Sequence, residues 1–351
     1  MDQENQTPHK RRVRYKGKYP KKFEEKYKEL QPEKYKDTIE HVIQKGNTPA
    51  GMHISIMVKE IIDFLNIQPG EIGFDATLGY GGHTKAMLKC LNGKGHIYAT
   101  DVDPEESDKT KKRLADQGFG EDLLTVKLQN FCTIDEIAKE VGGFDFILAD
   151  LGVSSMQIDN PKRGFSFKVD GPLDLRLNQE AGISAAERLD TITRDELAGM
   201  LYENSDEPYC EELAKAITDE IRKGNRIDTT TKLRQVIEKT LDFLPEKEKK
   251  DTIKKTCQRT FQALRIDVNR EFEVLYEFME KLPDALRPGG RVAILTFHSG
   301  EDKLVKKALK EGYKAGIYSD YAKDVIRPSA QECAQNGRAR STKMRWAVKN
   351  K

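Results

Sequence analysis

Apolar residues first recur with helical spacing at residues 53–66, which predicts an amphipathic helix. From residue 72 onward, short apolar runs alternate with helical patterns. We predict strands at 72–76, 96–100, 123–128 and 145–150. Four strands separated by helices within about 80 residues indicate an α/β fold with a doubly wound, mostly parallel sheet.

The strand rhythm stops after residue 155 and resumes only near the C-terminus. Between these points the pattern predicts helices at 184–202, 207–223, 229–243 and 246–257. A longer helix is predicted at 259–286, followed by strands at 291–297 and 343–348. We therefore predict an all-α insertion at 157–257 within a sheet domain formed by 51–156 and 258–351.

The first 50 residues are polar, contain four prolines and predict a basic, flexible extension. His9–Lys28 holds ten Lys or Arg and two Glu, although the whole chain has a net charge of only +2. Arg338–Lys351 adds six basic residues and no acidic one. These basic ends predict contact with a polyanion, and a solvated tail is the alternative.

Composition excludes several classes of protein. No apolar run approaches the roughly 20 residues of a membrane span, so we expect a cytoplasmic protein without membrane contact. The five cysteines are scattered without a CxxC pair, which predicts reduced thiols. The histidines are equally scattered, and we expect no metal.

A glycine-rich turn, Asp75-Ala-Thr-Leu-Gly-Tyr-Gly-Gly-His83, follows the first predicted strand. Glycines there let the backbone approach a ligand closely. Asp101 ends the second predicted strand, where a carboxylate can accept hydrogen bonds from both ribose hydroxyls. By this pattern alone, a nicotinamide dinucleotide and S-adenosylmethionine fit equally well.

Further polar and aromatic residues follow other strand ends. Asp150 ends the fourth predicted strand, and Ser154 lies in the loop behind it. Both therefore face the crevice in which open α/β sheets bind ligands. Phe131 follows the third strand and could pack against an adenine or belong to the core. His298 ends the strand predicted at 291–297 and could accept a proton or cap the strand.

Arg259, Gln262, Arg265 and Asn269 share one face of a predicted helix. Two arginines and two amides on one face suit phosphate and base contacts, and a solvated face is the alternative.

Several runs together resemble the bacterial ribosomal RNA small-subunit methyltransferase H family. The matching runs are DATLGYGGHT, TDVDP, LADLGVSSMQID, RGFSFKVDGPLDLR, RTFQALRIDVNRE, FHSGED and NGRARSTKMR. The resemblance covers about 53–348. It implies a class I S-adenosylmethionine-dependent methyltransferase with a helical insertion, acting on the exocyclic N4 of a cytosine in the decoding region of 16S rRNA.

The resemblance also implies roles for individual residues. Contacts to S-adenosylmethionine are expected from Gly81, Gly82, His83, Asp101, Phe131, Asp150 and Gln157. From the chemistry of N4 itself, we predict that Asp150 or a nearby backbone carbonyl accepts a hydrogen bond from N4, with Ser154 as a further candidate, and that His298 receives the proton or else caps the strand end. The expected RNA contacts are Arg163, Arg176, Arg259, Arg265, Arg338 and Arg340, with 16S rRNA in the 30S subunit as the partner. The oligomeric state stays open.

The chain departs from the family pattern in several loops. The family usually has HSLED where this chain has His298-Ser-Gly-Glu-Asp302, and NPRARS where Asn336-Gly-Arg-Ala-Arg-Ser341 stands. These changes favour a divergent second copy, whose target nucleotide could differ. A non-catalytic, cofactor-binding assembly factor is a further alternative. A DNA amino-methyltransferase is disfavoured, because the Pro-Pro motif of that class is absent.

Overall fold

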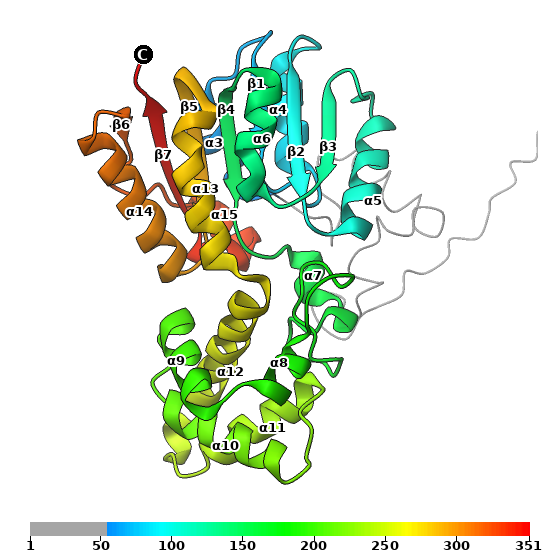
Figure 1. The fold of residues 1–351 in the computed structure, drawn as a ribbon, viewed down its shortest axis with the longest axis vertical. Helices are drawn as coiled ribbons and strands as arrows, with labels where there is room; N and C mark the ends of the chain where they lie inside the picture. The colour runs from blue at the N-terminus through cyan, green and yellow to red at the C-terminus, as the bar shows by residue number, and fades with distance from the viewer. Residues whose placement is uncertain (1–54) are drawn as a thin grey trace, which may run out of the picture. The chain divides into compact units, whose positions relative to one another are not determined.

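The computed structural model describes Ser55–Lys351, so the predicted extension at 1–50 lies outside the described residues. A seven-stranded sheet has the order β3-β2-β1-β4-β5-β7-β6 (Figure 1). Only β7 is antiparallel to its neighbours β5 and β6. The strands are β1 Ile72–Asp75, β2 His96–Asp101, β3 Leu124–Leu128, β4 Phe144–Asp150, β5 Leu286–Thr296, β6 Tyr318–Tyr321 and β7 Lys343–Lys349.

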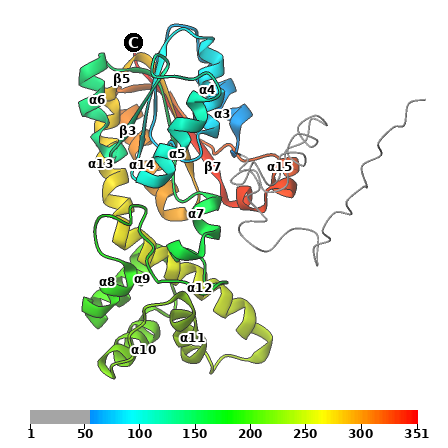
Figure 2. The ribbon, with the colours of Figure 1, turned by 90° about the vertical axis from the view of Figure 1, so that its right-hand side faces the viewer.

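Helices cover both faces of the sheet because successive strand residues point to opposite sides. Phe74 of β1 packs in one buried cluster with α6 and α13, whereas Ile97 of β2 packs with α3, α4 and α5 on the other face. Figure 2 shows the strands between these two layers. The layers consist of α3 Val58–Leu65, α4 Gly82–Leu91 and α5 Pro104–Ala115, and of α6 Ile134–Val141, α13 Glu271–Ala285 and α14 Ser299–Lys314. This is the predicted doubly wound α/β fold of class I methyltransferases.

The insertion encloses an apolar core of its own. Leu201, Leu213, Ile237 and Leu264 are fully buried together, each from a different helix. Its helices are α8 Ala185–Thr191, α9 Arg194–Ser205, α10 Cys210–Arg222, α11 Thr230–Thr240 and α12 Glu246–Asn269.

Several predicted elements differ in the structure, including the helix predicted at 259–286, which is broken at Arg270. The helix predicted at 184–202 is two helices, because the chain is extended at Ile192 and Thr193 caps α9 through the N–H of Glu196. The break predicted at 257–258 is absent, since α12 continues to Asn269 and the chain turns at Arg270 with φ 52°. Strand β5 begins at Leu286, five residues before the predicted start, and β6 was not predicted.

Short helical turns lie next to the carboxyl ends of the parallel strands. They are η2 Phe131–Thr133, α7 Ser155–Asp159, η3 Pro161–Arg163, α15 Ala330–Gln335 and η4 Gly337–Ser341. Within the described part of the chain, no helix has the length and apolar character that a bilayer crossing requires.

Candidate active site

The glycine-rich turn connects β1 to α4 in a conformation that requires glycine. Gly79 and Gly81 have φ of 48° and 73°, in the left-handed region. A Cβ on Gly81 would lie 2.8 Å from Cγ2 of Thr110, and one on Gly82 would lie 2.0 Å from Oγ of Ser55. Side chains are therefore excluded at Gly81 and Gly82, where the backbone is open to a ligand.

Asp101 lies beside this turn at the end of β2. Its Oδ2 accepts a hydrogen bond from the Gly79 N–H at 2.8 Å, and its Oδ1 accepts one from the Asp103 N–H at 2.9 Å. Burial raises the pKa of Asp101 to about 6, although these hydrogen bonds oppose the shift. Each carboxylate oxygen can accept a second hydrogen bond, so the residue fits a ligand with two neighbouring hydroxyl groups.

Asp150 lies at the end of β4, where its N–H donates to Thr77 Oγ1 at 2.8 Å. Its Oδ2 is 3.4 Å from His83 Nδ1. His83 Nε2 lies 2.8 Å from the Ile56 carbonyl oxygen, which can only accept, so Nε2 carries a proton. Asp150 and His83 can therefore form a hydrogen bond when a second proton lies between Oδ2 and Nδ1.

The other carboxylate oxygen of Asp150, Oδ1, is buried and has no hydrogen-bond partner among the described residues. Burial raises the pKa of Asp150 to about 6, and the charge of His83 opposes that shift. The structure thus holds an acceptor at the carboxyl end of β4 that nothing in the described chain satisfies.

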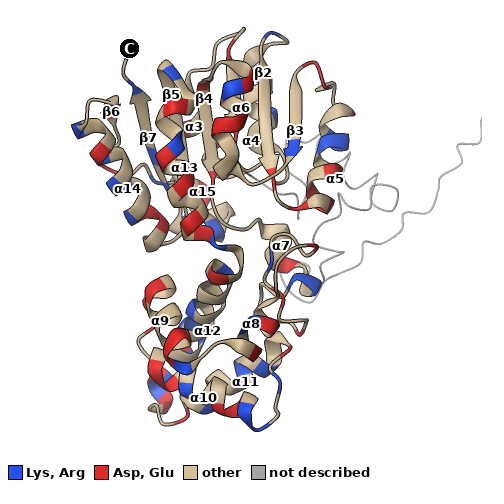
Figure 3. Ribbon diagram, viewed as in Figure 1, with Lys and Arg blue, Asp and Glu red and all other residues tan. Residues whose placement is uncertain are grey.

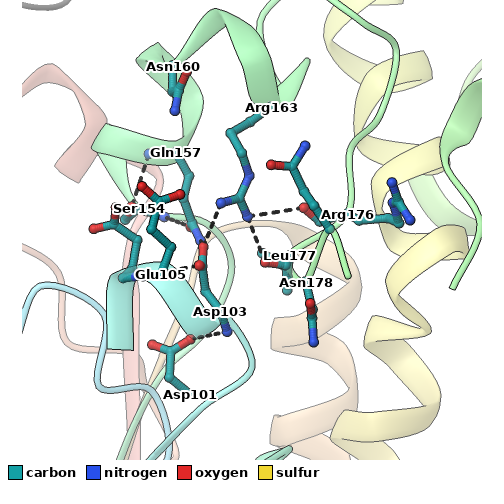
Figure 4. A network of polar contacts seen from close by, with 12 residues as sticks. Asp101, Asp103, Glu105, Ser154, Gln157, Asn160, Arg163, Arg176, Leu177 and Asn178 are labelled. Carbon is teal, nitrogen blue, oxygen red and sulfur yellow. Dashed lines mark hydrogen bonds and ion pairs between the residues drawn. The ribbon is translucent and has the colours of Figure 1, made fainter. Parts of the chain in front are cut away.

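A network of polar contacts joins the end of β2 to the entrance of the insertion (Figure 4). Arg163 Nη1 donates to Asp103 Oδ2 at 2.7 Å, and Gln157 Nε2 donates to the same oxygen at 3.1 Å. Arg163 Nη2 also donates to the carbonyl oxygens of Arg176 and Leu177. Ser154 and Gln157 form a capping box that begins α7. Gln157 is therefore joined through Asp103 to the predicted cofactor residue Asp101, and Ser154 caps α7.

A second polar cluster lies at the end of β5. His298 Nε2 is 3.2 Å from Glu301 Oε1, and the Phe297 N–H donates to Glu301 Oε2 at 2.8 Å. Burial would raise the pKa of Glu301, but the hydrogen bond and charge of His298 outweigh burial and lower it. Glu271 lies in the same cluster, and Arg265 donates to both of its carboxylate oxygens at 2.7 and 2.8 Å.

Glu271, His298 and Glu301 offer ligand atoms within 4.8 Å of one another, an arrangement that could hold a cation. Arg265 already neutralises Glu271 through both oxygens, so we assign no metal to this group. Glu271 and Glu301 were not predicted as site residues from the sequence. Glu301 lies within the FHSGED run, at the third position of α14, where a carboxylate often caps the helix start.

The predicted RNA contacts separate into two groups. Arg163 and Arg265 are held in ion pairs with Asp103 and Glu271, and Arg176 is paired with Asp174. Their contacts give these three guanidinium groups structural roles. The other three are more exposed: Arg259, whose side chain is 38% exposed and pairs with Glu207 at 3.8 Å, Arg338, which pairs with Asp159 at 2.7 Å, and Arg340.

Phe131 follows β3 and is partly buried, with its ring edge-to-face against Phe278 at 5.2 Å between centroids. It lies in the η2 turn, two strands away from the glycine-rich turn. Its packing on the core residue Phe278 fits the core alternative, and a contact with adenine stays a prediction.

Comparisons with known proteins identify the family. The MraW methylase family matches residues 50–350. Ribosomal RNA small subunit methyltransferase H 1 of Agathobacter rectalis is 87% identical over 349 residues, 99% of each chain. The protein of that name from Lachnoclostridium phytofermentans is 70% identical and covers 99% of this chain and 95% of its own.

A more distant relative differs in its coverage. Ribosomal RNA small subunit methyltransferase H of Acidobacterium capsulatum is 36% identical over 301 residues, which are 85% of this chain and 98% of that protein. The two relatives numbered H 1 thus match almost the full length of this chain, including most of its basic extension, whereas the family match begins at residue 50.

The sequence pattern left a nicotinamide dinucleotide and S-adenosylmethionine as equal candidates for the glycine-rich turn and Asp101. Membership of a methylase family decides between them. The chain belongs to the MraW methylase family and is a methyltransferase with S-adenosylmethionine as its methyl donor.

Proposed function

We propose that this enzyme methylates the exocyclic N4 of a cytosine in 16S rRNA, in the cytoplasm, with an assembled or assembling 30S subunit as substrate. The names of the relatives support ribosomal RNA as the substrate. The observation that carries the amino-group assignment is the buried Oδ1 of Asp150, an acceptor without a partner among the described residues. An exocyclic amino group has N–H donors that fit such an acceptor.

The residues at the ends of β1, β2 and β4 fit the cofactor. The turn with Gly81 and Gly82 would receive its methionine part, Asp101 its ribose and Phe131 its adenine. When bound, S-adenosylmethionine supplies a methyl group on a sulfonium centre, so the protein chiefly has to orient donor and acceptor. His83 would then lie between the cofactor-binding turn and Asp150.

Cytosine N4 is a weak nucleophile, because its lone pair is delocalised into the ring. A carboxylate that accepts one N4 hydrogen favours the pyramidal geometry in which the lone pair is available. Positive charge develops on N4 during methyl transfer, and negative charge at Asp150 and Glu301 stabilises it. The target base must leave its stack to reach this edge of the sheet.

We assign the later proton transfer to His298. Both of its ring nitrogens are buried without a hydrogen-bond partner in the described part of the chain, and Nε2 lies 3.2 Å from Glu301 Oε1. Glu301 therefore orients the ring and stabilises its protonated form, as a carboxylate does for a general base. His298→Gln should lower kcat by about 100-fold and leave cofactor affinity within about twofold.

The decisive experiment compares Asp150→Asn with a matched control, Asp145→Asn. Both residues lie on β4, but Asp145 is at the opposite end and pairs with Arg287. Tritium transfer from labelled S-adenosylmethionine to 30S subunits lacking the modification is measured, followed by nucleoside mass spectrometry. We expect wild type and Asp145→Asn to form N4-methylcytidine, and Asp150→Asn to lose at least about 100-fold in rate.

Three outcomes would contradict the proposal, each in a different way. Label at another nucleotide would mean that the divergent loops have retargeted a working methyltransferase. Cofactor binding without any label would favour the assembly-factor alternative. A fully active Asp150→Asn enzyme would overturn the role of Asp150 alone.

A further inference from the structure

Helix α14 carries a row of lysines along one exposed face. Lys303, Lys306, Lys307, Lys310 and Lys314 are all exposed. At 100° per residue, these positions span an arc of about 100° on the helix surface. Figure 3 marks the basic positions along α14 in blue. We call these five residues the α14 lysine row.

No ammonium group of this row lies within ion-pair distance of an acidic side chain among the described residues. Some lysines on two other surface helices are paired. Lys112 of α5 pairs with Asp108 at 2.7 Å, and Lys139 of α6 pairs with Asp135 at 3.0 Å, each one helical turn earlier. The charges of the α14 lysine row therefore lack the local neutralisation seen on α5 and α6.

The acidic residues of α14 do not neutralise the positive charge of the α14 lysine row. Glu301 and Asp302 are buried and engaged by His298 and by Lys343 and Arg345, respectively. The exposed surface of the helix keeps five lysines against the single Glu311, a net charge of +4. The opposite face is anchored in the core through Val305 and Leu309, which fixes the row toward solvent.

An aromatic pair lies beside the row. Tyr313 is 41% exposed and stacks on Tyr321 of β6, with ring centroids 5.0 Å apart. On the helix, Tyr313 lies three residues after Lys310 and seven after Lys306, so it shares their side. An exposed aromatic ring beside unpaired lysines is the combination that binds single-stranded nucleic acid, through stacking and phosphate contacts.

The row begins next to the proposed catalytic centre. Helix α14 starts at Ser299, directly after His298. Lys303 follows about 6 Å along the helix axis, and the row extends about 16 Å further to Lys314. A strand whose base occupies the site would therefore pass this surface on leaving it.

We propose that the α14 lysine row binds the phosphates of the RNA strand that flanks the target nucleotide, with Tyr313 as a stacking platform for one of its bases. This inference rests on the proposed function, because it takes RNA as the substrate. It adds a binding surface outside the helical insertion and outside the basic loop at Arg338 and Arg340.

The test uses the full-length protein with two triple variants. One neutralises Lys303, Lys307 and Lys310 to Gln. The matched control neutralises Lys111, Lys112 and Lys139 to Gln, three exposed lysines whose ammonium groups pair with Glu121, Asp108 and Asp135. Affinity for a 16S rRNA transcript is measured over a range of salt concentrations, together with methyl transfer to 30S subunits.

We expect the α14 variant to bind RNA at least about tenfold more weakly. The negative slope of log K against log salt should become shallower by about 2. Its KM for RNA should rise by the same factor, with kcat and cofactor affinity unchanged. Tyr313→Leu should weaken binding about fivefold without altering the salt slope, since stacking releases no counterions.

Equal, small effects of both triple variants, or an unchanged salt slope, would overturn the inference. So would an identical loss of affinity for duplex DNA, which would make the row a general polyanion surface. Wild-type methyl transfer, measured alongside, tests the proposed function separately. An active wild type with an unaffected α14 variant refutes the lysine row alone.

Discussion

Asp103 and Arg163 form a buried ion pair at 2.7 Å, although they lie 60 residues apart in the chain. Their side chains are 2% and 6% exposed. Asp103 also caps α5 and donates its N–H to Asp101, while Arg163 binds the carbonyl oxygens of Arg176 and Leu177. One guanidinium group thus fixes the residue next to the proposed ribose carboxylate and the backbone that enters the insertion.

We predict that Arg163→Lys weakens S-adenosylmethionine binding by about tenfold and lowers RNA affinity as well. Lysine keeps the charge but cannot bridge a carboxylate and two carbonyls, because it lacks the planar fork of arginine. Arg163→Gln should cost about 3–5 kcal/mol of stability, since it leaves Asp103 buried without its partner. Isothermal titration with cofactor and thermal unfolding measure the two effects.

Arg291→Lys is the matched control for this prediction. Arg291 likewise joins a carboxylate, Glu71, to the Leu65 carbonyl oxygen, but at the amino end of the strands. It should lower stability without changing cofactor affinity. Equal losses of cofactor binding in both variants would assign Arg163 a purely structural role.

The pH dependence of activity should follow two buried carboxylates. Burial raises the pKa of both Asp101 and Asp150 to about 6, and both act as acceptors only when ionised. We expect kcat/KM to level off above about pH 7 and to fall about tenfold per pH unit below 6 for each group required. A flat profile between pH 5 and 7 would contradict both assignments.

The same pKa shifts predict that stability falls with rising pH, whereas activity rises. A carboxylate whose pKa is raised by folding destabilises the folded state as pH rises from its ordinary value of 3.8 through about 6. Asp150→Asn should therefore raise stability at pH 7, by on the order of 2 kcal/mol, and the gain should vanish near pH 4. The free energy of unfolding of wild type and Asp150→Asn, measured with denaturant at pH 4 and pH 7, tests this prediction.

The effects of substitutions at Gly300 and Phe272 on stability and activity should be interdependent. A Cβ on Gly300 would lie 2.6 Å from Cζ of Phe272 and 3.2 Å from Nδ1 of His298. Gly300→Ala should cost about 1–3 kcal/mol of stability and displace His298, which lowers methyl transfer. Phe272→Leu combined with Gly300→Ala should restore much of both, because the smaller side chain frees that space. Additive losses in the double variant would refute the coupling.

The extension is expected to add RNA affinity rather than catalysis. The family match begins at residue 50, while the relatives numbered H 1 align with 99% of this chain. Deletion of 1–37, which removes the His9–Lys28 cluster of net charge +8, should weaken RNA binding and flatten its salt dependence. The rate constant at saturating RNA should not change. Unaltered binding would make the extension a passive tail.

The sequence predicted the sheet well, because its strands are short apolar runs bounded by Gly, Pro and Asp. The turn at Arg270 could not be predicted in the same way. No glycine or proline marks it, and Asn269 is held there by Leu175 and Leu177, more than 90 residues away. By contrast, the start of α9 carried a signal, Thr193 three residues before Glu196, that the periodicity concealed.

Prediction of the candidate site was limited in the same way, by contacts between residues that lie far apart in the sequence. Asp101, Asp150 and His298 could be placed at strand ends, since a parallel sheet gathers those ends on one edge. Arg163 was predicted as an RNA contact, but its side chain is buried. Its burial depends on Asp103, a partner that only the folded chain brings near.

The antiparallel strand β7 has a consequence for when the enzyme becomes active. It lies between β5 and β6, and its Lys343 and Arg345 hold Asp302, the neighbour of Glu301. A nascent chain that has not yet released residues 343–349 lacks both this strand and the support of the proposed proton-accepting pair. Residues 343–349 therefore have to be available for folding before catalysis can begin, and we expect a chain truncated before Lys343 to lack methyl transfer.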